Sequence, residues 1–529
     1  MTTVQRKNPY TPIAIAATFV VIVAATYLLR GGAYYPHVIV EARKNVTIEF
    51  VQQSLPKNED CRAAVATVAQ AVRVSCPMCR IALQECSAGP LPEYETLLSE
   101  EPITTPSSRL LKGVVIYHWE DGALALAACR EAERVSASNP ETRTTCYPPN
   151  ARRPLLAQPA PRIDPHQVVL GLLVLLFTAA VSGFIGYLIV RYEAVHARWS
   201  HDPAHTGPQK FHARPTPRIG GLGVMASLFV SGAVLLVTDQ SASGEPFGYL
   251  LLASLPAFLG GITEDVTKTV SVGARLMLTM LAAAIGVLLL GAVIPRLDVP
   301  GFDALLKWIP FGIAFTMFAV GGVANSINII DGYNGLAGGH AVIVLVAMAG
   351  MSVVIGDAFL TMSALAMIGA LLGFLTWNYP KGKIFLGDGG AYLLGFWLAE
   401  LSVLIVVRHP QVSPWFPMLL LVYPIFETLY SMYRRKVIGG LSPGQPDRMH
   451  LHQVIYMYVV SVRARKRDTS SVTRYNNMVA PYGWSLTLLC TVPAIFLWHD
   501  TLLLQSMSVL FCFAYVFLYR YISSRSVLS

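Results

Sequence analysis

Long apolar segments dominate this chain and restrict it to a fold that crosses a membrane many times. A helix needs about 17 to 25 apolar residues to cross a bilayer, depending on its tilt. Only 13% of the residues are charged and 54% are hydrophobic, whereas soluble domains are about 25% charged. The sequence therefore predicts an all-α polytopic membrane protein with about 12 transmembrane helices. The apolar segments lie near 12–29, 167–190, 220–238, 248–263, 274–294, 309–328, 340–356, 358–377, 391–408, 414–433, 482–498 and 501–519.

The distribution of Lys and Arg predicts the orientation of these helices, because both residues accumulate in cytoplasmic loops. If the N-terminus is cytoplasmic, the short outside loops hold only Arg296, Lys307 and Arg408, while the cytoplasmic loop 434–480 holds nine basic residues. The net charge of +9 also raises the question of nucleic-acid binding. No folded basic domain with aromatic stacking positions is visible in the sequence, so we expect a lipid bilayer and no nucleic acid as partner.

Residues 30–166 are of mixed composition and are predicted to form a small α+β domain outside the cytoplasm, inserted after the first helix. The segment contains a strand-like stretch at 46–51 and a helix-like stretch at 60–74. It also holds six of the eight cysteines, which predicts a disulfide framework in an oxidising compartment. A redox pair or half of a zinc site at the CxxC sequence is the alternative. The six are Cys61, Cys76, Cys79, Cys86, Cys129 and Cys146.

The predicted organisation follows from these segments. A membrane anchor at 1–29 precedes the outer domain at 30–166, and a multi-helix domain at 167–520 ends in a cytoplasmic tail at 521–529. The first apolar segment could instead be a signal peptide. Its 18-residue core exceeds the usual length of about 7 to 15 and no small-x-small site follows, which favours an uncleaved anchor.

The stretch 325–339 places polar residues and glycines where the sequence is otherwise apolar. It offers Asn325, Asn328, Asp331 and Asn334, and a carboxylate at membrane depth costs roughly 2.5 to 3.5 kcal/mol. In a helix, Asn328 and Asp331 share a face, as do Asp331 and Asn334. We expect the glycines to let the backbone approach a charged substrate closely. Polar contacts between helices are the alternative.

A second motif lies in the loop before the third apolar segment. Lys210, His212 and Arg218 are followed by glycines that open a helix. The start of a helix can bind phosphate, because its free backbone N–H groups and the helix dipole attract an anion. Electrostatic anchoring on the cytoplasmic side is the alternative.

Two further motifs supply carboxylates. Glu264 and Asp265 end the fourth segment and Arg275 follows them, so a metal ion or the neighbouring cations must offset the repulsion between the two acids. A solvated helix end is the alternative there. Asp388 is flanked by glycines at the start of an apolar helix, where capping of that helix is the alternative.

The fifth motif lies in the large basic loop and contains Arg448, His450 and His452. Two histidines can bind a metal, but no further soft ligand is near and Arg448 fits a nucleotide phosphate better. The basic run at 463–467 is predicted to contact lipid headgroups.

All five motifs fall on the predicted cytoplasmic side, so together they predict a phosphate site with a hard divalent ion, because Mg²⁺ bridges carboxylates to substrate phosphates. Mn²⁺ is the alternative ion. A site at the membrane surface implies one water-soluble and one lipid-borne substrate, between which phosphoryl transfer takes place.

The same residues also resemble a known family. The motifs PTPRIGGLG, GITEDV with Arg275, NSINIIDGYNGLAGG, FLGDGGAYLLG and PDRMHLHQ, in this order over about 210–453, are similar to those of the polyprenyl-phosphate N-acetylhexosamine-1-phosphate transferases, glycosyltransferase family 4. The resemblance covers roughly 167–520. It implies a Mg²⁺-dependent enzyme of the bacterial inner membrane that takes a UDP-N-acetylsugar and undecaprenyl phosphate, releases UMP and starts a surface glycan such as O-antigen. A homodimer is an alternative to a monomer.

The resemblance also implies roles for single residues. Asp388 would ligate the metal, with Asn328 or Asp331 as a second ligand, and Glu264 and Asp265 match an acidic pair near the lipid phosphate. Glu264 stands where the family usually has Asp, and Asn334 stands where many bacterial members have a second Asp. The residues implied to hold substrate are Lys210, His212, Arg218, Arg275, Asn325, Asn328, Asn334, Arg448, His450 and His452.

Two other classes of function are alternatives to a transferase. A transporter of lipid-linked or anionic sugars would place its site near the bilayer midplane and often shows internal repeats, whereas these acids lie at helix ends and no repeat is visible. The outer domain could instead be a binding module on an inactive scaffold. The presence of Asp265, Asp331 and Asp388 together argues against inactivity.

Overall fold

The computed structural model divides the chain into two compact units, one formed by residues 22–168 and the other by 1–21 with 169–529. The predicted first membrane segment, 12–29, lies outside the described residues. The structure describes residues 35–42, 46–52, 58–75, 79–87, 107–110, 113–118, 126–127, 129–130, 133, 145–147, 165–202, 215–238, 243–440, 447, 449–463 and 469–526.

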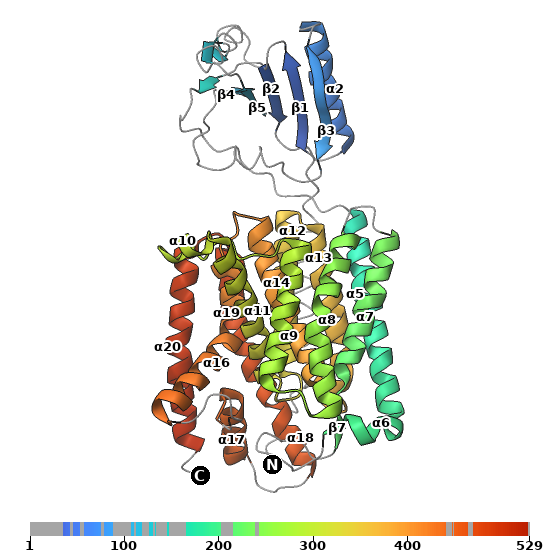
Figure 1. Cartoon of the computed structure of the whole chain (residues 1–529), viewed down its shortest axis with the longest axis vertical. Coiled ribbons are helices and arrows are strands. Elements are labelled where there is room, and N and C mark those ends of the chain that lie inside the picture. The colour runs from blue at the N-terminus through green and yellow to red at the C-terminus, as the bar shows by residue number, and fades with distance from the viewer. Residues whose placement is uncertain are drawn as a thin grey trace, which may run out of the picture. The chain divides into compact units, whose positions relative to one another are not determined.

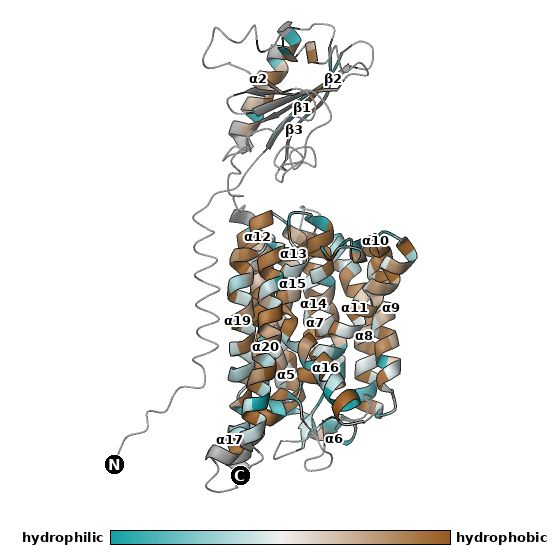
Figure 2. Cartoon of the chain, turned by 90° about the vertical axis from the view of Figure 1, so that its left-hand side faces the viewer, coloured by the Kyte–Doolittle hydropathy of each residue, from teal (hydrophilic) through white to brown (hydrophobic). Residues whose placement is uncertain are grey.

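The second unit is a helical bundle (Figure 1). Ten of its helices, counted over the described residues, are long and apolar enough to cross a membrane, and Figure 2 shows hydrophobic residues along them. The chain is therefore a multi-pass membrane protein, as predicted. The ten are α5 (Pro165–Arg191), α7 (Gly220–Thr238), α8 (Gly244–Thr267), α9 (Val272–Leu290), α11 (Ile309–Ile330), α12 (Leu336–Ile355), α13 (Ala358–Asn378), α14 (Gly387–Arg408), α19 (Val479–Leu497) and α20 (Thr501–Ser526).

Helix α14 lies at the centre of the bundle. In its most apolar stretch 89% of the residues are buried, against 22% in α9 and in α20. The peripheral helices expose large apolar side chains such as Leu288 and Phe513, as lipid-facing helices do, because hydrocarbon solvates apolar groups and cannot solvate the backbone. Polar side chains at the start of α14 are consequently held in a protein environment.

The predicted span at 414–433 is not one continuous helix. It consists of α15 (Trp415–Leu420) and α16 (Val422–Tyr433), and a π-helical turn at Arg434–Ile438 follows. Pro424 lies in the first turn of α16 and has no N–H to bond the preceding turn, which interrupts the helix at Leu421. The described residues therefore contain ten long membrane helices where the sequence predicts eleven.

Short elements gather at the end of the bundle where α8 and α11 finish and α9 and α14 begin. These are α6 (Glu193–Ser200), α17 (Leu451–Arg463) and α18 (Thr469–Asn477), seen together in Figure 1. A two-residue ladder of β7 (His201–Asp202) with β8 (Thr216–Pro217) holds the chain that leads into α7. At the other end of the bundle lies α10 (Phe302–Leu306).

The first unit is an α+β domain, as predicted. Helix α2 (Asn58–Ser75) packs on β1 and β3, and its Val65 joins Val38 and Val40 of β1 in the core. All strand pairs are antiparallel, in the order β3-β1-β2-β5-β4-β6. The strands are β1 (Tyr35–Ala42), β2 (Val46–Gln52), β3 (Arg80–Ser87), β4 (Ser107–Leu110), β5 (Gly113–His118) and β6 (Thr145–Tyr147).

Disulfide bonds tie this small domain together. Cys61 of α2 is bonded to Cys86 of β3, and Cys129 is bonded to Cys146 of β6. Cys79 is disulfide-bonded as well. These bonds agree with the predicted disulfide framework, which compensates for the limited core of a small domain.

Candidate active site

The carboxylate of Asp388 is the meeting point of the polar groups at this end of the bundle. Asp388 lies in the first turn of α14. Its oxygens pair with Arg218, at 3.3 Å, and with Arg275 at the start of α9. They also accept a hydrogen bond from the amide of Asn328 near the end of α11, at 2.9 Å. The structure thus brings together residues from four of the predicted motifs.

Asp265 holds the start of α14 in place. It lies in the last turns of α8 and is fully buried. Its two carboxylate oxygens accept the backbone N–H groups of Asp388, at 2.9 Å, and Gly389, at 2.8 Å. Because the first N–H groups of a helix have no partner within it, this carboxylate caps α14 from a neighbouring helix. Arg218 lies 3.4 Å from the same carboxylate.

Glycines of three motifs lie at close helix contacts around Asp388. A Cβ at Gly261 of α8 would collide with the backbone of Asp388, and one at Gly221 of α7 with the backbone of Gly390. Gly387 also has a φ of +76°, a conformation that other residues rarely adopt. Glycine therefore lets α7, α8 and α14 approach closely enough to position Asp388.

The prediction that backbone N–H groups at the start of α7 bind phosphate is wrong for Gly220 and Gly221. Gly220 and Gly221 do not offer free N–H groups, since they donate to the carbonyls of Phe385 and Leu386, each at 2.9 Å. Phe385 in turn donates to Pro217 at 2.8 Å. Buried backbone groups need partners, and the segment before α14 supplies them. Arg218 remains at the site through its side chain.

Asp331 follows the last residue of α11 and is partly buried. Burial raises its pKa to about 7; the positive charge of Arg218 opposes this shift and the negative charge of Asp265 adds to it. Asn325, further back in α11, accepts a hydrogen bond from the hydroxyl of Tyr392 at 3.3 Å. The guanidinium of Arg275 lies over the ring of Tyr392, 5.6 Å from its centre. Asn325 therefore supports the site through Tyr392.

Asn334 does not share a helical face with Asp331, because α11 ends at Ile330 and a turn follows. Asn334 is buried, and its amide donates to the side chain of Asn477 in α18 at 2.9 Å. Its backbone N–H donates to Asn476 at 3.0 Å. The sequence pattern did not indicate these amide partners, because they lie more than 140 positions away.

The two histidines of the PDRMHLHQ motif begin α17, and their rings stack with centres 5.3 Å apart. His452 lies against the turn that follows α11, with its ring 5.5 Å from that of Tyr333. Burial, together with the neighbouring His450, lowers the pKa of His452 to about 3, so His452 is neutral at pH 7. Its buried Nδ1 has no hydrogen-bond partner within the described part of the chain.

Glu427 of α16 holds His450 and the start of α17, a contact that the sequence motifs did not indicate. Its buried carboxylate bonds to Nδ1 of His450 at 2.9 Å and accepts the backbone N–H of Leu451 and the hydroxyl of Tyr515. An acid inside the apolar segment 414–433 was the available signal, because a charge at membrane depth needs a partner.

Part of the chain matches a known protein family. Residues 247–406 match glycosyl transferase family 4. The chain is 30% identical over 263 residues to the Bacillus subtilis (strain 168) protein named "Probable undecaprenyl-phosphate N-acetylglucosaminyl 1-phosphate transferase", over 48% of this chain and 70% of the relative. The chain belongs to glycosyl transferase family 4.

Two other relatives in the family point the same way. The Escherichia coli (strain K12) "Undecaprenyl-phosphate alpha-N-acetylglucosaminyl 1-phosphate transferase" is 29% identical over 260 residues, covering 47% of this chain and 67% of the relative. The Mycolicibacterium smegmatis "Decaprenyl-phosphate N-acetylglucosaminephosphotransferase" is 28% identical over 318 residues, covering 54% of this chain and 74% of the relative.

Among the described residues of this family 4 chain, one more predicted site residue bonds elsewhere. Glu264 accepts the backbone N–H of Val270 at 2.7 Å. Three predicted substrate residues, Lys210, His212 and Arg448, lie outside the described residues.

The side chains around Asp388 fit a Mg²⁺ ion that is shared with a substrate. In the part of the chain that the structure describes, no three His, Cys, Asp or Glu side chains gather as a metal centre. Mg²⁺, however, usually takes only one or two carboxylates and completes its shell with water and substrate phosphates. Asp388, Asn328 and Asp331 offer the oxygen donors required. Nε of Arg275 is buried without a described partner, which leaves a cationic donor for an anion.

Proposed function

We propose that this family 4 chain transfers the sugar-1-phosphate of a UDP-N-acetylsugar to undecaprenyl phosphate. A phosphate oxygen of the lipid attacks the sugar-bearing phosphorus of the nucleotide sugar. A new P–O bond forms, the bond from that phosphorus to the bridging oxygen breaks, and UMP leaves with the electron pair. The other product is undecaprenyl-diphospho-sugar. The names of the relatives favour N-acetylglucosamine as the sugar.

The observation that carries this proposal is the convergence of Arg218 and Arg275 on Asp388. Two guanidinium groups at one carboxylate offer bidentate donors to phosphate oxygens. Asp265 fixes the backbone of Asp388, so the donors are in place before the substrates arrive. Positioning and charge neutralisation account for most of the catalysis in phosphoryl transfer.

The reaction does not require a strong base. A phosphate monoester has its second pKa near 6, so the lipid phosphate is mostly dianionic at pH 7. Asp265 is an unsuitable base because both of its oxygens already accept backbone N–H groups. Its role is to position Asp388.

Asp388 would hold Mg²⁺, with Asn328 or Asp331 as the second ligand. When bound, the ion offsets negative charge on the diphosphate. Arg218 and Arg275 lie beside the same carboxylate, and they would hold the phosphate oxygens that the metal leaves free.

The neutral His452 and its neighbour His450 would bind the nucleotide sugar. The unpartnered Nδ1 of His452 and its place against the turn after α11 support this role. Glu427 keeps the histidine pair at that turn.

The site lies at the end of the bundle that the distribution of Lys and Arg predicts to be cytoplasmic. We assign the protein to a bacterial inner membrane, with residues 30–166 on the periplasmic side. The product would then begin a surface glycan, O-antigen or a related polysaccharide, on the cytoplasmic face.

Release of UMP tests the proposal. The purified full chain is incubated with undecaprenyl phosphate, Mg²⁺ and each of several UDP-N-acetylsugars, with and without EDTA. We expect UMP from at least one sugar, its loss with EDTA, and its loss in Asp388→Asn. Asp500→Asn is the matched control, because Asp500 caps α20 through Leu503 at the other end of the bundle.

Absence of UMP with every sugar would overturn the proposal, as would full activity in Asp388→Asn. Movement of a lipid-linked sugar across vesicles without any UMP would favour the transporter alternative.

A further inference from the structure

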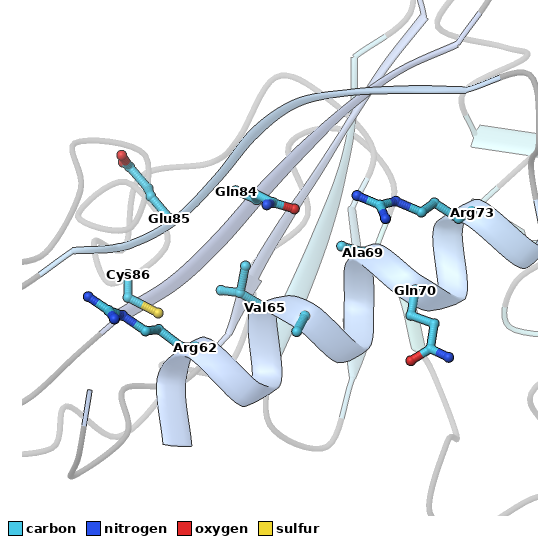
Figure 3. Close-up of a pocket in the computed structure, with 9 residues that line it drawn as sticks. Arg62, Val65, Ala69, Gln70, Arg73, Gln84, Glu85 and Cys86 are labelled. Carbon is cyan, nitrogen blue, oxygen red and sulfur yellow. The ribbon is translucent and has the colours of Figure 1, made fainter. Parts of the chain in front are cut away.

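The first unit, the α+β domain, contains a groove of about 770 Å³ between α2 and β3 (Figure 3). Six α2 residues line it, from Arg62 to Arg73, at the spacing of one helical face. Residues 84–86 of β3 line the opposite side. Nothing in the transferase proposal uses this groove.

The β3 side of the groove is the edge of a sheet. Strand β3 is the first strand in the sheet order and, among the described strands, pairs only with β1. Side chains of successive strand residues point to opposite faces. Three consecutive residues therefore line the groove only if the groove reaches the edge of the strand and its backbone. Such an edge presents N–H and C=O groups to which another strand can be added.

The groove is polar and carries more positive than negative charge. Arg62 and Arg73 lie near its two ends and Glu85 is the one acid among the described lining residues (Figure 3). Neither arginine forms an ion pair with a described residue. None of the described lining residues is aromatic, whereas small-molecule pockets are mostly apolar and aromatic. This composition favours an extended acidic polymer over a compact ligand.

The distance between the arginines fits an extended polypeptide. Arg62 and Arg73 are eleven positions apart, which corresponds to about 16 Å along a helix. An extended strand rises about 3.3 Å per residue, so residues four positions apart lie on the same face about 13 Å from each other. The long arginine side chains span the remaining distance. Two acidic residues at this spacing would each meet one guanidinium.

A disulfide bond also fixes α2 and β3, the two elements that form the groove, relative to each other. The disulfide between Cys61 and Cys86 joins the start of α2 to the end of β3. Figure 3 shows Cys86 close to Arg62. A preformed site loses less conformational entropy on binding than a flexible one.

We propose that the groove between α2 and β3 binds an extended acidic segment of another polypeptide, which adds as a strand to the edge of β3. Backbone hydrogen bonds to β3 provide affinity, and Arg62 and Arg73 select carboxylates four positions apart. The domain would thereby recruit a protein partner from its own compartment.

Binding of a synthetic peptide to the full chain in detergent micelles tests this proposal. The probe is a fluorescent peptide of about nine residues, alternating Val and Thr, with two Glu residues four positions apart. We expect binding to wild type to weaken by about tenfold or more in the double variant Arg62→Glu, Arg73→Glu. The same peptide with Lys in place of Glu should regain affinity for that variant. Arg80→Glu is the matched control, because Arg80 is an exposed β3 residue outside the groove lining.

Two peptide series test strand addition itself. Alternate residues of a strand direct their N–H groups to the same edge. N-methylation of the peptide N–H groups that face β3 should abolish binding. N-methylation of the N–H groups that face the other way should leave the affinity within about twofold of that of the unmodified peptide. Resistance of Cys61 and Cys86 to thiol labelling shows that each variant has formed this disulfide.

Equal binding by wild type and the double variant would overturn the proposal, as would equal loss in Arg80→Glu. Equal binding of the two N-methylated series would exclude strand addition. Binding of an acidic polysaccharide, tested with oligogalacturonate, without binding of the peptide would show that the groove takes a glycan.

Discussion

The carboxylate of Asp265 accepts the backbone N–H of Asp388 at 2.9 Å, across the interface of α8 and α14. One buried acid thereby fixes the position of a second acid that faces the proposed substrates. The two residues are 123 positions apart in the chain. In this pair, Asp265 positions Asp388, the residue that we propose to bind Mg²⁺.

Asp265→Asn should reduce activity without unfolding the protein. Asn keeps one acceptor oxygen, so one of the two N–H bonds to α14 is lost. A misplacement of Asp388 by about 1 Å would lower kcat by about 100-fold, and loss of the cap would cost about 1 kcal/mol of stability. UMP release and thermal unfolding measure the two effects. Asp303→Asn is the control, since Asp303 also accepts a backbone N–H but at a remote loop. Activity within about twofold of wild type would contradict the positioning role.

Gly261→Ala should destabilise the bundle. The added methyl would meet the backbone of Asp388, which cannot move without displacing α14, and overpacking of this kind costs about 1 to 3 kcal/mol. Gly248→Ala, in the same helix, meets nothing within 4 Å, so it should be neutral or slightly stabilising. Thermal unfolding of both variants in detergent checks the prediction. Equal melting temperatures of Gly261→Ala and Gly248→Ala would contradict the prediction, because they would show that α8 and α14 can move apart without a loss of stability.

Glu427→Gln should weaken binding of the nucleotide sugar more than it slows the chemical step. The substitution removes the negative charge that orients His450, and a hydrogen bond to a charged group contributes about 1.5 to 3 kcal/mol. We expect KM for the UDP-sugar to rise about tenfold with a smaller change in kcat.

Tyr515→Phe removes one hydrogen bond to Glu427 but leaves the carboxylate charge, so its effect on KM should be smaller than that of Glu427→Gln. A fall in kcat with KM unchanged in Glu427→Gln would assign Glu427 to catalysis instead.

Asp357 should give the protein an acid-sensitive contribution to stability. It caps α13 at the end of the bundle opposite Asp388 and pairs with Arg408, at 2.6 Å, and His409, at 2.8 Å. Burial alone would raise the pKa of Asp357, but the bonds to His409 and Arg408 outweigh it and lower the pKa to about 2. A lowered carboxyl pKa stabilises the fold above the unfolded value of 3.8, and this contribution is lost as pH falls through about 2.

Asp357→Asn should therefore lower the free energy of unfolding by about 2 kcal/mol at pH 7. The difference from wild type should shrink as the pH falls from about 4 to about 2. Thermal unfolding of both proteins in detergent across this pH range measures the difference. Asp500→Asn is the control, because Asp500 also caps a helix but has no described ion pair. A difference that does not change with pH would argue that the ion pairs contribute nothing.

Local composition alone predicted much of this protein. Apolar segments located the ten long helices of the described residues, because a membrane-crossing helix satisfies its backbone hydrogen bonds internally and presents apolar side chains to the hydrocarbon. The polar motifs named Asp265, Asp388 and Arg275 as members of one site, since charges at membrane depth require one another.

Only the tertiary structure decided how these residues act on one another. It placed Gly221 and Gly261 at helix contacts, showed that the N–H groups of Gly220 and Gly221 donate to carbonyls before α14, and showed that Glu427 bonds to His450. The sequence names the donors, acceptors and small residues. Which of them meet depends on close packing between helices distant in the chain, and neither hydropathy nor motif spacing encodes that geometry.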